Sequence, residues 1–416
     1  MALIVQKFGG TSMGSLERIQ HVASRVKRSY DEGHQIIVVV SAMCGETDRL
    51  IQLAKGINPH PDPREYDALI STGEQVSMTL LAMALISKGC LARSYNAQQV
   101  KIVTDKKHKK ARIAKVEIEA IQHDLDKGNI VIVAGFQGVT ENGDITTLGR
   151  GGSDTTAVAI AAAVQADECQ IFTDVDGVYT ADPRVVPNAR HLPHITFQEM
   201  LELSSLGAKV LQFHSVECAA QNRVPLRVLS TFLEGPGTLI TFEDPAKPLP
   251  PVSGIAYSRN ESLITLRGLP AHTNTAAKIL TPISRANIDV DMIVQTMDSH
   301  GLIDFTFTLE RDEYPRAYAI LSELMKDLGA KEILGNAKIV KLSLVGVGMR
   351  SNPGIASKMF AILGSSGINI QLISTSEIKI SVLIDETSLE VGVQTLHAAF
   401  GLEHENGKYD LVEISN

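Results

Sequence analysis

A chain of 416 residues is long enough for two or three domains, since a single hydrophobic core seldom grows beyond about 250 to 300 residues. Hydrophobic residues make up 44% and charged residues 21%, with a net charge of -8, which is typical of an ordinary soluble globular protein. The acidic balance argues against nucleic acid as a partner. The one basic cluster, Lys106 to Arg112, lacks interleaved aromatic residues, and we interpret it as a solvated loop.

The cysteines and the apolar segments of the sequence indicate the cellular compartment in which the protein is expected. The four cysteines are far apart and form no Cys-x-x-Cys pair, so neither a disulfide framework nor a zinc site is expected. The N-terminus has no long apolar signal core, and no run of about 18 apolar residues occurs. We therefore expect a cytoplasmic protein with no membrane partner.

The N-terminal stretch predicts a strand, a helix and a second strand. The apolar run Ala2 to Val5 leads to Lys7 and two glycines, so Lys7 should lie at the carboxyl end of a buried strand, where open α/β sheets bind ligands. Helical periodicity follows over Leu16 to Val26, and Ile36 to Val40 predicts the second strand. A right-handed crossover would place Lys7 and Ser41 on the same rim of the sheet. The glycines are not a Walker A loop, because no Gly-Lys-Ser/Thr follows them.

The middle of the chain continues this alternation. A helix is predicted over Gln75 to Ser87, and Glu74 before it is either an acid favoured by the helix dipole or a ligand-binding residue. Ile130 to Ala134 and Gln170 to Thr173 predict further buried strands. Alternating strands and helices indicate a largely parallel sheet covered on both faces.

A glycine-rich loop, Leu148 to Thr156, runs directly into the Ala-rich stretch Ala157 to Val164, which predicts a helix with Ser153, Asp154 and two threonines as capping residues. Adjacent glycines at a helix N-terminus suit an anion such as phosphate. An acid would be an odd partner for phosphate, so Asp154 is expected to orient a lysine or a metal ion. The alternative is a plain helix cap after a flexible loop.

Charged loops and a linker close the first part of the chain. Asp182-Pro183-Arg184 and Lys209 are loop elements that, taken singly, read as a turn and a solvated lysine. Val224 to Leu229 predicts one last strand. The Pro-rich stretch Pro245 to Pro251 then predicts a stiff linker and a domain boundary.

The remainder contains an internal repeat. Ala276 to Ile279 and Asn287 to Ile293 recur at an offset of about eighty residues as Ala356 to Met359 and Gly367 to Ile373. Each copy predicts a strand, a turn, a helix, two strands and a helix. Neither copy has a charged cluster suited to catalysis, and Gly346-Val347-Gly348 lacks the third glycine of a dinucleotide fingerprint. We expect two small α/β modules that bind a small molecule or each other.

Four motifs in order, followed by the tandem modules, resemble the aspartate kinase family over nearly the whole chain. They are Lys7 to Ser12, Gly149 to Asp154, Thr173 to Tyr179 and Ile373 to Ile378. The resemblance implies an α/β amino-acid-kinase fold, a mainly parallel sheet sandwiched by helices, for residues 1–245. It implies two ferredoxin-like ACT domains for residues 253–336 and 338–416, and thus the monofunctional form rather than a fusion to homoserine dehydrogenase.

The implied reaction transfers the γ-phosphoryl group of ATP to the β-carboxylate of L-aspartate, the first step toward lysine, threonine and methionine. The acceptor is already ionised at neutral pH, so no general base is needed, and catalysis should rest on positioning and charge neutralisation. Lys7 would neutralise charge on the transferring oxygens, Gly9 and Gly10 would donate backbone N–H groups, and Asp154 would orient Lys7.

The resemblance also implies binding residues. Glu74 would take the substrate ammonium and Arg150 its α-carboxylate. The other substrate-binding positions are Thr47, Gly151, Gly152 and Ser153. Besides Lys7, Gly9 and Gly10, the ATP-binding positions are Ser41, Thr173, Asp174, Tyr179, Asp182, Arg184, Lys209 and Val210. No protein residue is assigned to a metal, and Mg²⁺ should bridge the phosphates mostly through water.

Regulation is expected in the ACT modules, with lysine or threonine, or both, as effectors. The second copy keeps the Pro-Gly turn of such modules at Asn352 to Ala356, whereas Ala271 to Thr275 in the first copy lacks the proline and glycine. The first turn should keep its shape but not its ligand contacts, so the second copy should supply most of at least one effector site per chain. The effector-binding positions are Gln295, Ile355, Ala356, Asn369, Ile370, Ser376 and Glu377. We expect a homodimer or a higher oligomer.

Two alternatives from other classes remain open. Another amino-acid kinase, acting on glutamate, acetylglutamate, carbamate or UMP, would share the glycine loops but should lack tandem ACT modules. A non-catalytic amino-acid sensor would be expected to have lost Lys7 or Asp154, and both are present.

Overall fold

The computed structural model describes residues 1–206, 210–243 and 250–404. Within them the chain forms two compact units. Residues 1–178, 191–205 and 210–243 make up the first unit, and residues 179–190, 206 and 250–404 make up the second.

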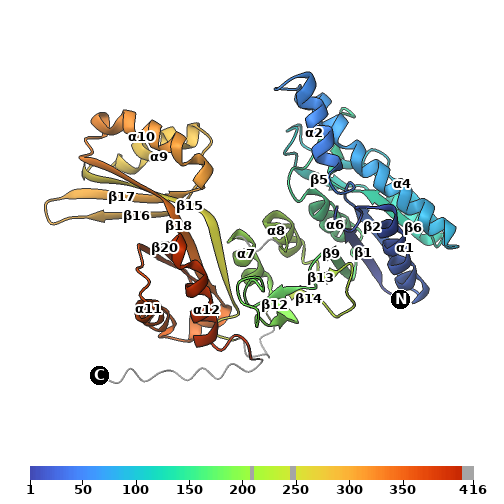
Figure 1. The fold of residues 1–416 in the computed structure, drawn as a ribbon. Coiled ribbons are helices and arrows are strands. Elements are labelled where there is room, and N and C mark those ends of the chain that lie inside the picture. Colours follow the sequence, from blue (N-terminus) through green and yellow to red (C-terminus); the bar gives the residue numbers. More distant parts are fainter. Residues whose placement is uncertain (207–209, 244–249, 405–416) are drawn as a thin grey trace. The chain divides into compact units, whose positions relative to one another are not determined.

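The first unit is built on an eight-stranded sheet with the strand order β12-β14-β13-β9-β1-β2-β6-β3 (Figure 1). Neighbouring strands from β13 to β3 are parallel, and only the β13–β14 pair is antiparallel. Every residue of β6 is buried, as expected for a parallel strand covered on both faces. The predicted, largely parallel sheet is confirmed. Its strands are β1 (Leu3–Phe8), β2 (Gln35–Val40), β3 (Ala92–Tyr95), β6 (Ile130–Ala134), β9 (Glu168–Thr173), β12 (His194–Thr196), β13 (Leu226–Ser230) and β14 (Thr238–Thr241).

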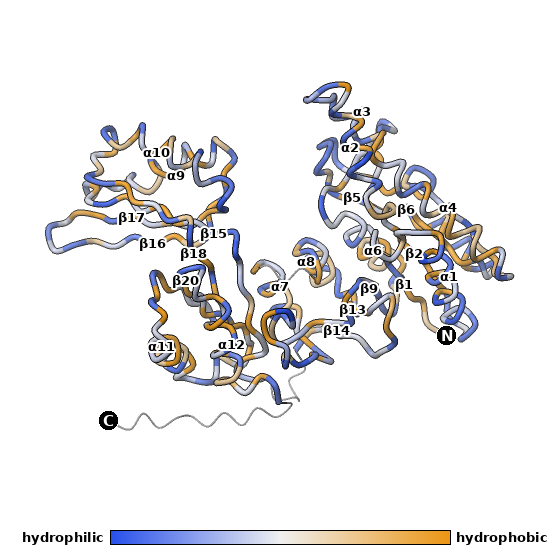
Figure 2. The backbone as a smooth tube through the Cα atoms, viewed as in Figure 1, coloured by the Kyte–Doolittle hydropathy of each residue, from blue (hydrophilic) through white to orange (hydrophobic). Residues whose placement is uncertain are grey.

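Helices cover both faces of this sheet. On one face Val22 of α1 (Leu16–Asp31) and Leu81 of α4 (Thr72–Ser87) share a core with Val38 of β2. Alternate strand residues point the other way, where α6 (Gly152–Ala163) packs on β1, β2 and β9. Figure 2 shows hydrophobic residues along β6 and α4. Because α4 begins three residues before its predicted start, Glu74 lies inside its first turn.

Several elements of the first unit lay outside the predictions, including β3, β12 and β14 of the main sheet. The prediction that Val224 to Leu229 forms the last strand is wrong, because β14 follows it. A second sheet has the order β5-β4-β7-β8, with strands of only three or four residues. Its strands are β4 (Ile102–Thr104), β5 (Ile113–Val116), β7 (Gln137–Val139) and β8 (Ile145–Thr147). The further elements are α2 (Glu46–Ile57), α3 (Pro63–Ile70), α5 (Glu119–Asp126), α7 (Phe197–Ser205), α8 (Phe213–Asn222), β11 (His191–Leu192) and β10 (Val178–Tyr179), whose second residue is counted with the second unit.

Helices α3 and α4 follow one another directly. From Pro63 to Ser87 they form the one stretch, among the residues that the structure describes, that is long and apolar enough to cross a membrane by length and composition. Of its most apolar window, 56% is buried inside the protein, which is the arrangement of a core helix.

The second unit contains a six-stranded antiparallel sheet with the order β16-β17-β15-β18-β20-β19. The helices α9, α10, α11 and α12 accompany it (Figure 1). The predicted repeat is confirmed, because β15-α9-β16-β17-α10 is followed by β18-α11-β19-β20-α12. Each copy has its own hydrophobic core, and the long strands β15 and β18 run through both. The elements are β15 (Gly254–Pro270), α9 (Thr275–Arg285), β16 (Val290–Met297), β17 (Leu302–Leu309), α10 (Tyr314–Leu328), β18 (Glu332–Val345), α11 (Ile355–Ser365), β19 (Leu372–Thr375), β20 (Lys379–Asp385) and α12 (Leu389–Ala399).

The segment 179–190 belongs to the second unit although it precedes the last strands of the first. Thr180 hydrogen-bonds to buried His397 of α12 (Oγ1 to Nε2, 2.9 Å), and Gln394 donates to the carbonyl of Val185 (2.9 Å). Val185 and Val186 also join the core of the second copy. Most of the predicted Pro-rich linker, residues 245–249 of Pro245 to Pro251, lies outside the described residues.

Candidate functional site

A cavity of about 670 Å³ opens where β1, β2 and β6 end and α6 begins. This is the edge at which the sequence placed Lys7 and Ser41, and both residues line the cavity. Gly9 is not part of the lining, although a Cβ there would lie 3.3 Å from Nζ of Lys7. The predicted site residues that line the cavity are Lys7, Gly10, Ser41, Thr47, Glu74, Arg150, Gly151, Gly152, Ser153 and Asp154.

Lys7 and Asp154 form a largely buried ion pair in this cavity. Nζ of Lys7 lies 2.5 Å from Oδ1 of Asp154, and the two side chains are 12% and 10% exposed. The prediction that side chains cap α6 is wrong, because the N-cap is Gly151 and no side chain makes the capping hydrogen bond. Asp154 instead lies in the first turn, where its carboxylate faces the lysine. Asp154, beside the glycine loop, therefore pairs with the Lys7 ammonium and does not cap α6.

Gly151 fixes the approach of the glycine loop to α6. Its φ of 72° lies in the left-handed region, which costs a residue with a side chain about 1 kcal/mol or more. A Cβ at this position would also lie 2.3 Å from Cγ of Gln212. With glycine here, the first turn of α6 lies at the cavity, where the positive end of the helix dipole favours an anion.

Glu74 is a buried acid in the same cavity, 3% exposed. Its Oε1 accepts a hydrogen bond from the backbone N–H of Ala42 (3.1 Å), and its Oε2 has no hydrogen-bond partner among the described residues. Burial raises the pKa of Glu74 to about 8, and the Ala42 hydrogen bond opposes only part of that effect. A cation that enters the cavity beside Oε2 would restore the charge of this carboxyl.

Arg150 and Lys109 add positive charge to the cavity lining. Arg150 is exposed, and no described residue pairs with its guanidinium. Lys109 belongs to the basic cluster that the sequence assigned to a solvated loop; it is exposed, yet it lines the cavity with its Nζ 4.6 Å from the ring centre of Tyr66. Neither Lys109 nor Tyr66 carries a signal in the sequence, because only the tertiary fold brings them to the cavity.

The predicted ATP-binding positions lie in different parts of the chain. Thr173 ends β9, the strand beside β1, and its hydroxyl donates to Asp174 (3.0 Å). Tyr179, Asp182 and Arg184 belong to the second unit, and Val210 lies in a turn of the first. Lys209 lies outside the described residues. None of these described positions lines the cavity.

The carboxylate of Asp182 already has hydrogen-bond partners within the second unit. It accepts hydrogen bonds from Arg184 (Nη2 to Oδ2, 2.8 Å) and from the Tyr257 hydroxyl (2.8 Å). The Arg184 hydrogen bond lowers the pKa of Asp182 to about 2, so the carboxylate is ionised at neutral pH.

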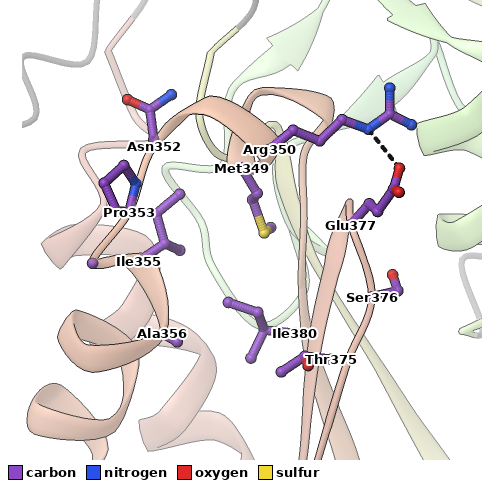
Figure 3. A pocket seen from close by; sticks show the side chains of 11 residues that line it. Met349, Arg350, Asn352, Pro353, Ile355, Ala356, Thr375, Ser376, Glu377 and Ile380 are labelled. Atoms are coloured by element: carbon purple, nitrogen blue, oxygen red, sulfur yellow. Dashed lines mark ion pairs between the residues drawn. The ribbon is translucent and has the colours of Figure 1, made fainter.

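A second cavity, of about 580 Å³, lies in the second copy of the repeat, at the N-terminus of α11 and beside β19 (Figure 3). Four of the predicted effector residues line it, namely Ile355, Ala356, Ser376 and Glu377. Asn369 and Ile370 do not line it, and Gln295 lies on β16 of the first copy. Arg350 and Glu377, which both line the cavity, form an ion pair (Nε to Oε2, 3.2 Å; Figure 3).

The two copies differ at the turn before this helix. Gly354 precedes α11 with a φ of 96°, in the left-handed region, whereas Asn274 precedes α9 with a φ of -109°. The expectation that the first turn keeps the shape of the second is wrong. Without glycine, the chain avoids the cost of the left-handed conformation by adopting another turn.

Comparison with known proteins agrees with this geometry. Residues 2–230 match the model of the amino acid kinase family, and residues 342–400 match an ACT domain model. An aspartate kinase of Pseudomonas putida is 58% identical over 404 residues, which are 97% of this chain and 98% of the relative.

Two solved structures of E. coli aspartokinase III are similar at 26% identity, each covering 95% of this chain and 99% of that chain. The complex with aspartate and ADP, in the R-state, gives a TM-score of 0.78, and the complex with lysine and aspartate, in the T-state, gives 0.76. The glycine loop, the paired lysine and acid, and a similarity that spans nearly the whole chain together show that this chain belongs to the aspartate kinase family.

Proposed function

We propose that this chain is an ATP-dependent kinase that phosphorylates the β-carboxylate of L-aspartate to give 4-phospho-L-aspartate. The observation that carries the proposal is the Lys7–Asp154 ion pair at the end of β1, in one cavity with Glu74 and Arg150. These groups match the charges of aspartate, which brings one ammonium and two carboxylates.

Glu74 binds the substrate ammonium in this proposal. Its unpartnered Oε2 and its raised pKa both support the role, since an arriving ammonium supplies the missing partner and the missing charge. Arg150 binds the α-carboxylate, because its planar guanidinium can hold a carboxylate through two parallel hydrogen bonds. Thr47 and Ser153, which also line the cavity, add hydrogen bonds.

Lys7 acts on the transferring phosphoryl group. The β-carboxylate attacks as an anion and needs no base, so the barrier comes from bringing negative charges together. Lys7 neutralises the charge that spreads over the phosphoryl oxygens, and Asp154 holds the ammonium in place. The N-terminus of α6 adds its positive dipole end on the same side.

For the nucleotide, Thr173 and Asp174, at the end of β9, and Val210 are the proposed contacts from the first unit. The assignment of Tyr179, Asp182 and Arg184, of the second unit, and of Lys209, outside the described residues, rests on the family resemblance alone. No group of three His, Cys, Asp or Glu side chains fit to hold a metal occurs in residues 1–206, 210–243 and 250–404. Magnesium, which supplies charge neutralisation when bound, would therefore be held chiefly by phosphate oxygens and water.

An amino-acid effector, lysine or threonine, binds in the cavity of the second copy. The N–H groups at the start of α11 suit the effector carboxylate, and Glu377 suits its ammonium. Effector binding would shift a conformational equilibrium of an oligomer, at least a dimer. We also propose that the enzyme acts in amino-acid biosynthesis in the cytoplasm, with neither a membrane nor a nucleic acid as a partner.

The experiment measures ADP release by the purified chain with L-aspartate, with L-glutamate and with no acceptor, and repeats it with lysine and threonine added. We expect aspartate-dependent release that at least one of the two amino acids inhibits. Release with glutamate alone would indicate another amino-acid kinase. No release with either acceptor, together with binding of an amino acid, would indicate a sensor.

A further inference from the structure

Asp67 is a buried acid that the proposed chemistry does not use. It lies on α3 and is 0% exposed. Its carboxylate accepts hydrogen bonds from the hydroxyl (2.7 Å) and the N–H (3.1 Å) of Thr147 and from the N–H of Lys109 (2.9 Å), and it pairs with Nδ1 of His108 (2.9 Å). A fully buried carboxylate with this many partners is costly to disturb, because each donor left unpaired in the interior costs free energy.

One of these partners is held in an unfavourable conformation. Lys109 has a φ of 68°, in the left-handed region, although it is not a glycine. Such a residue persists only where the surroundings fix it, and here the Asp67 carboxylate accepts its N–H. Asp67 therefore sets the course of the loop around Lys109.

Thr147, another of these partners, lines the acceptor cavity. Thr147 ends β8, three residues before Arg150. The two segments that Asp67 holds also touch each other directly, since the N–H of Ala111 donates to the carbonyl of Thr147 (2.9 Å) and a Cβ on Gly149 would lie 3.2 Å from the carbonyl oxygen of Lys109. The short loop that carries Arg150 thus starts from a point fixed by Asp67 and leans on a segment fixed by Asp67.

We propose that Asp67 is a positioning residue for Arg150, which it holds at the α-carboxylate of the acceptor through Thr147 and the loop at Lys109. This proposal rests on the proposed role of Arg150. It predicts a loss of acceptor recognition, rather than of phosphoryl transfer, when Asp67 is changed, because Lys7 is held in β1 and Asp154 in α6, which packs on β1, β2 and β9.

The test compares wild type with Asp67→Asn, which keeps the size of the side chain but turns one acceptor oxygen into a donor facing N–H groups. The readouts are kcat, both KM values and the ratio between the inhibition constant of L-aspartic acid α-amide and the KM of aspartate. The α-amide replaces the α-carboxylate by a neutral group, so the ratio reports recognition of that carboxylate alone. We expect KM for aspartate to rise about tenfold and the ratio to fall about as far, with kcat and KM for ATP within about twofold, since small misplacements of a binding group cost this much or more.

Three further variants separate positioning from general damage. Asp124→Asn removes another buried acid, which bonds to Tyr95 away from the cavity, and should leave the ratio unchanged. Lys109→Gly keeps the N–H that Asp67 accepts and suits the left-handed φ, but it removes an ammonium that lines the cavity, so the ratio should fall by less than in Asp67→Asn. His108→Ala removes one partner of Asp67 at a site that is 19% exposed, and should lower the ratio by less than Asp67→Asn.

Each result decides the matter. An unchanged ratio in folded Asp67→Asn, or a ratio that falls as far in Lys109→Gly, overturns the proposal. Should Asp67→Asn fail to fold, an unchanged ratio in His108→Ala overturns it. Arg150→Lys is measured alongside: if that variant lowers the ratio and Asp67→Asn does not, only the positioning role fails, whereas an unaffected ratio in Arg150→Lys means that the assignment of Arg150 itself is wrong.

Discussion

Replacing Glu74 by glutamine should remove a pH dependence that the buried carboxyl imposes on the use of aspartate. Burial raises the pKa of Glu74 to about 8, so the free enzyme holds this carboxyl mostly protonated at neutral pH. The proposed substrate ammonium needs the carboxylate, and the ionised fraction is about one tenth at pH 7 and about one half at pH 8. Glu74 must therefore lose its proton when aspartate binds. As a result, kcat/KM for aspartate should rise about tenfold per pH unit below pH 7, rise about fivefold from pH 7 to pH 8, and then level off.

The assay measures initial rates at low aspartate and saturating ATP between pH 6 and pH 9. Glu74→Gln should give a lower profile without that rise, because the amide does not titrate. Glu46→Gln is the matched control: Glu46 begins the neighbouring helix α2, pairs with Arg49, which lowers its pKa, and does not line the cavity, so this variant should keep the wild-type slope. A flat wild-type profile between pH 6 and pH 8, or an unchanged slope in Glu74→Gln, would refute the reasoning.

Three further changes test the other assignments. Lys7→Ala should lower kcat by about 10² to 10³ or more while ATP still binds by calorimetry, because the charge acts mainly in the transition state; a variant with more than a tenth of wild-type kcat would remove Lys7 from the mechanism. Arg150→Lys should raise KM for aspartate far more than KM for ATP, since lysine cannot make the bidentate contact, and equal shifts would count against the assignment. Calorimetric titration with lysine and threonine should find one tight site per chain. Binding should be weaker in Gly354→Ala, because alanine disfavours a φ of 96° by about 1 kcal/mol. Two equally tight sites would contradict the asymmetry of the copies, and no binding of either amino acid would remove the effector assignment.

The sheet could be predicted because its strands obey a simple rule. Strands buried on both faces are continuous apolar runs, and Ile130–Ala134 was predicted with both ends as observed. The start of α4 could not be placed, since Thr72 and Gly73 are weak helix formers, and only the structure shows that Gly73 and Glu74 are buried in its first turn. The second sheet was missed because strands of three or four residues show no periodicity.

For the site, too, the residues in local sequence motifs could be predicted, and those that depend on distant segments could not. Lys7, Asp154 and Arg150 sit in glycine-rich motifs that local chemistry makes visible, and the structure brings them to one cavity. The burial of Glu74 and the contacts of Asp67 depend on segments more than thirty residues away, so no local pattern could reveal them. In the first copy, the sequence shows that the turn before α9 lacks a glycine. Only the structure shows that the backbone adopts a different turn there, at Asn274.

A crystal structure with L-aspartate and a non-hydrolysable ATP analogue tests the central claim most directly. We predict the aspartate ammonium within hydrogen-bond distance of Glu74 Oε2, the α-carboxylate on the guanidinium of Arg150, and the β-carboxylate facing the terminal phosphate with the Lys7 ammonium between them. Aspartate bound the other way round, with its β-carboxylate on Arg150, or bound outside the cavity that Lys7 and Glu74 line, would contradict the account.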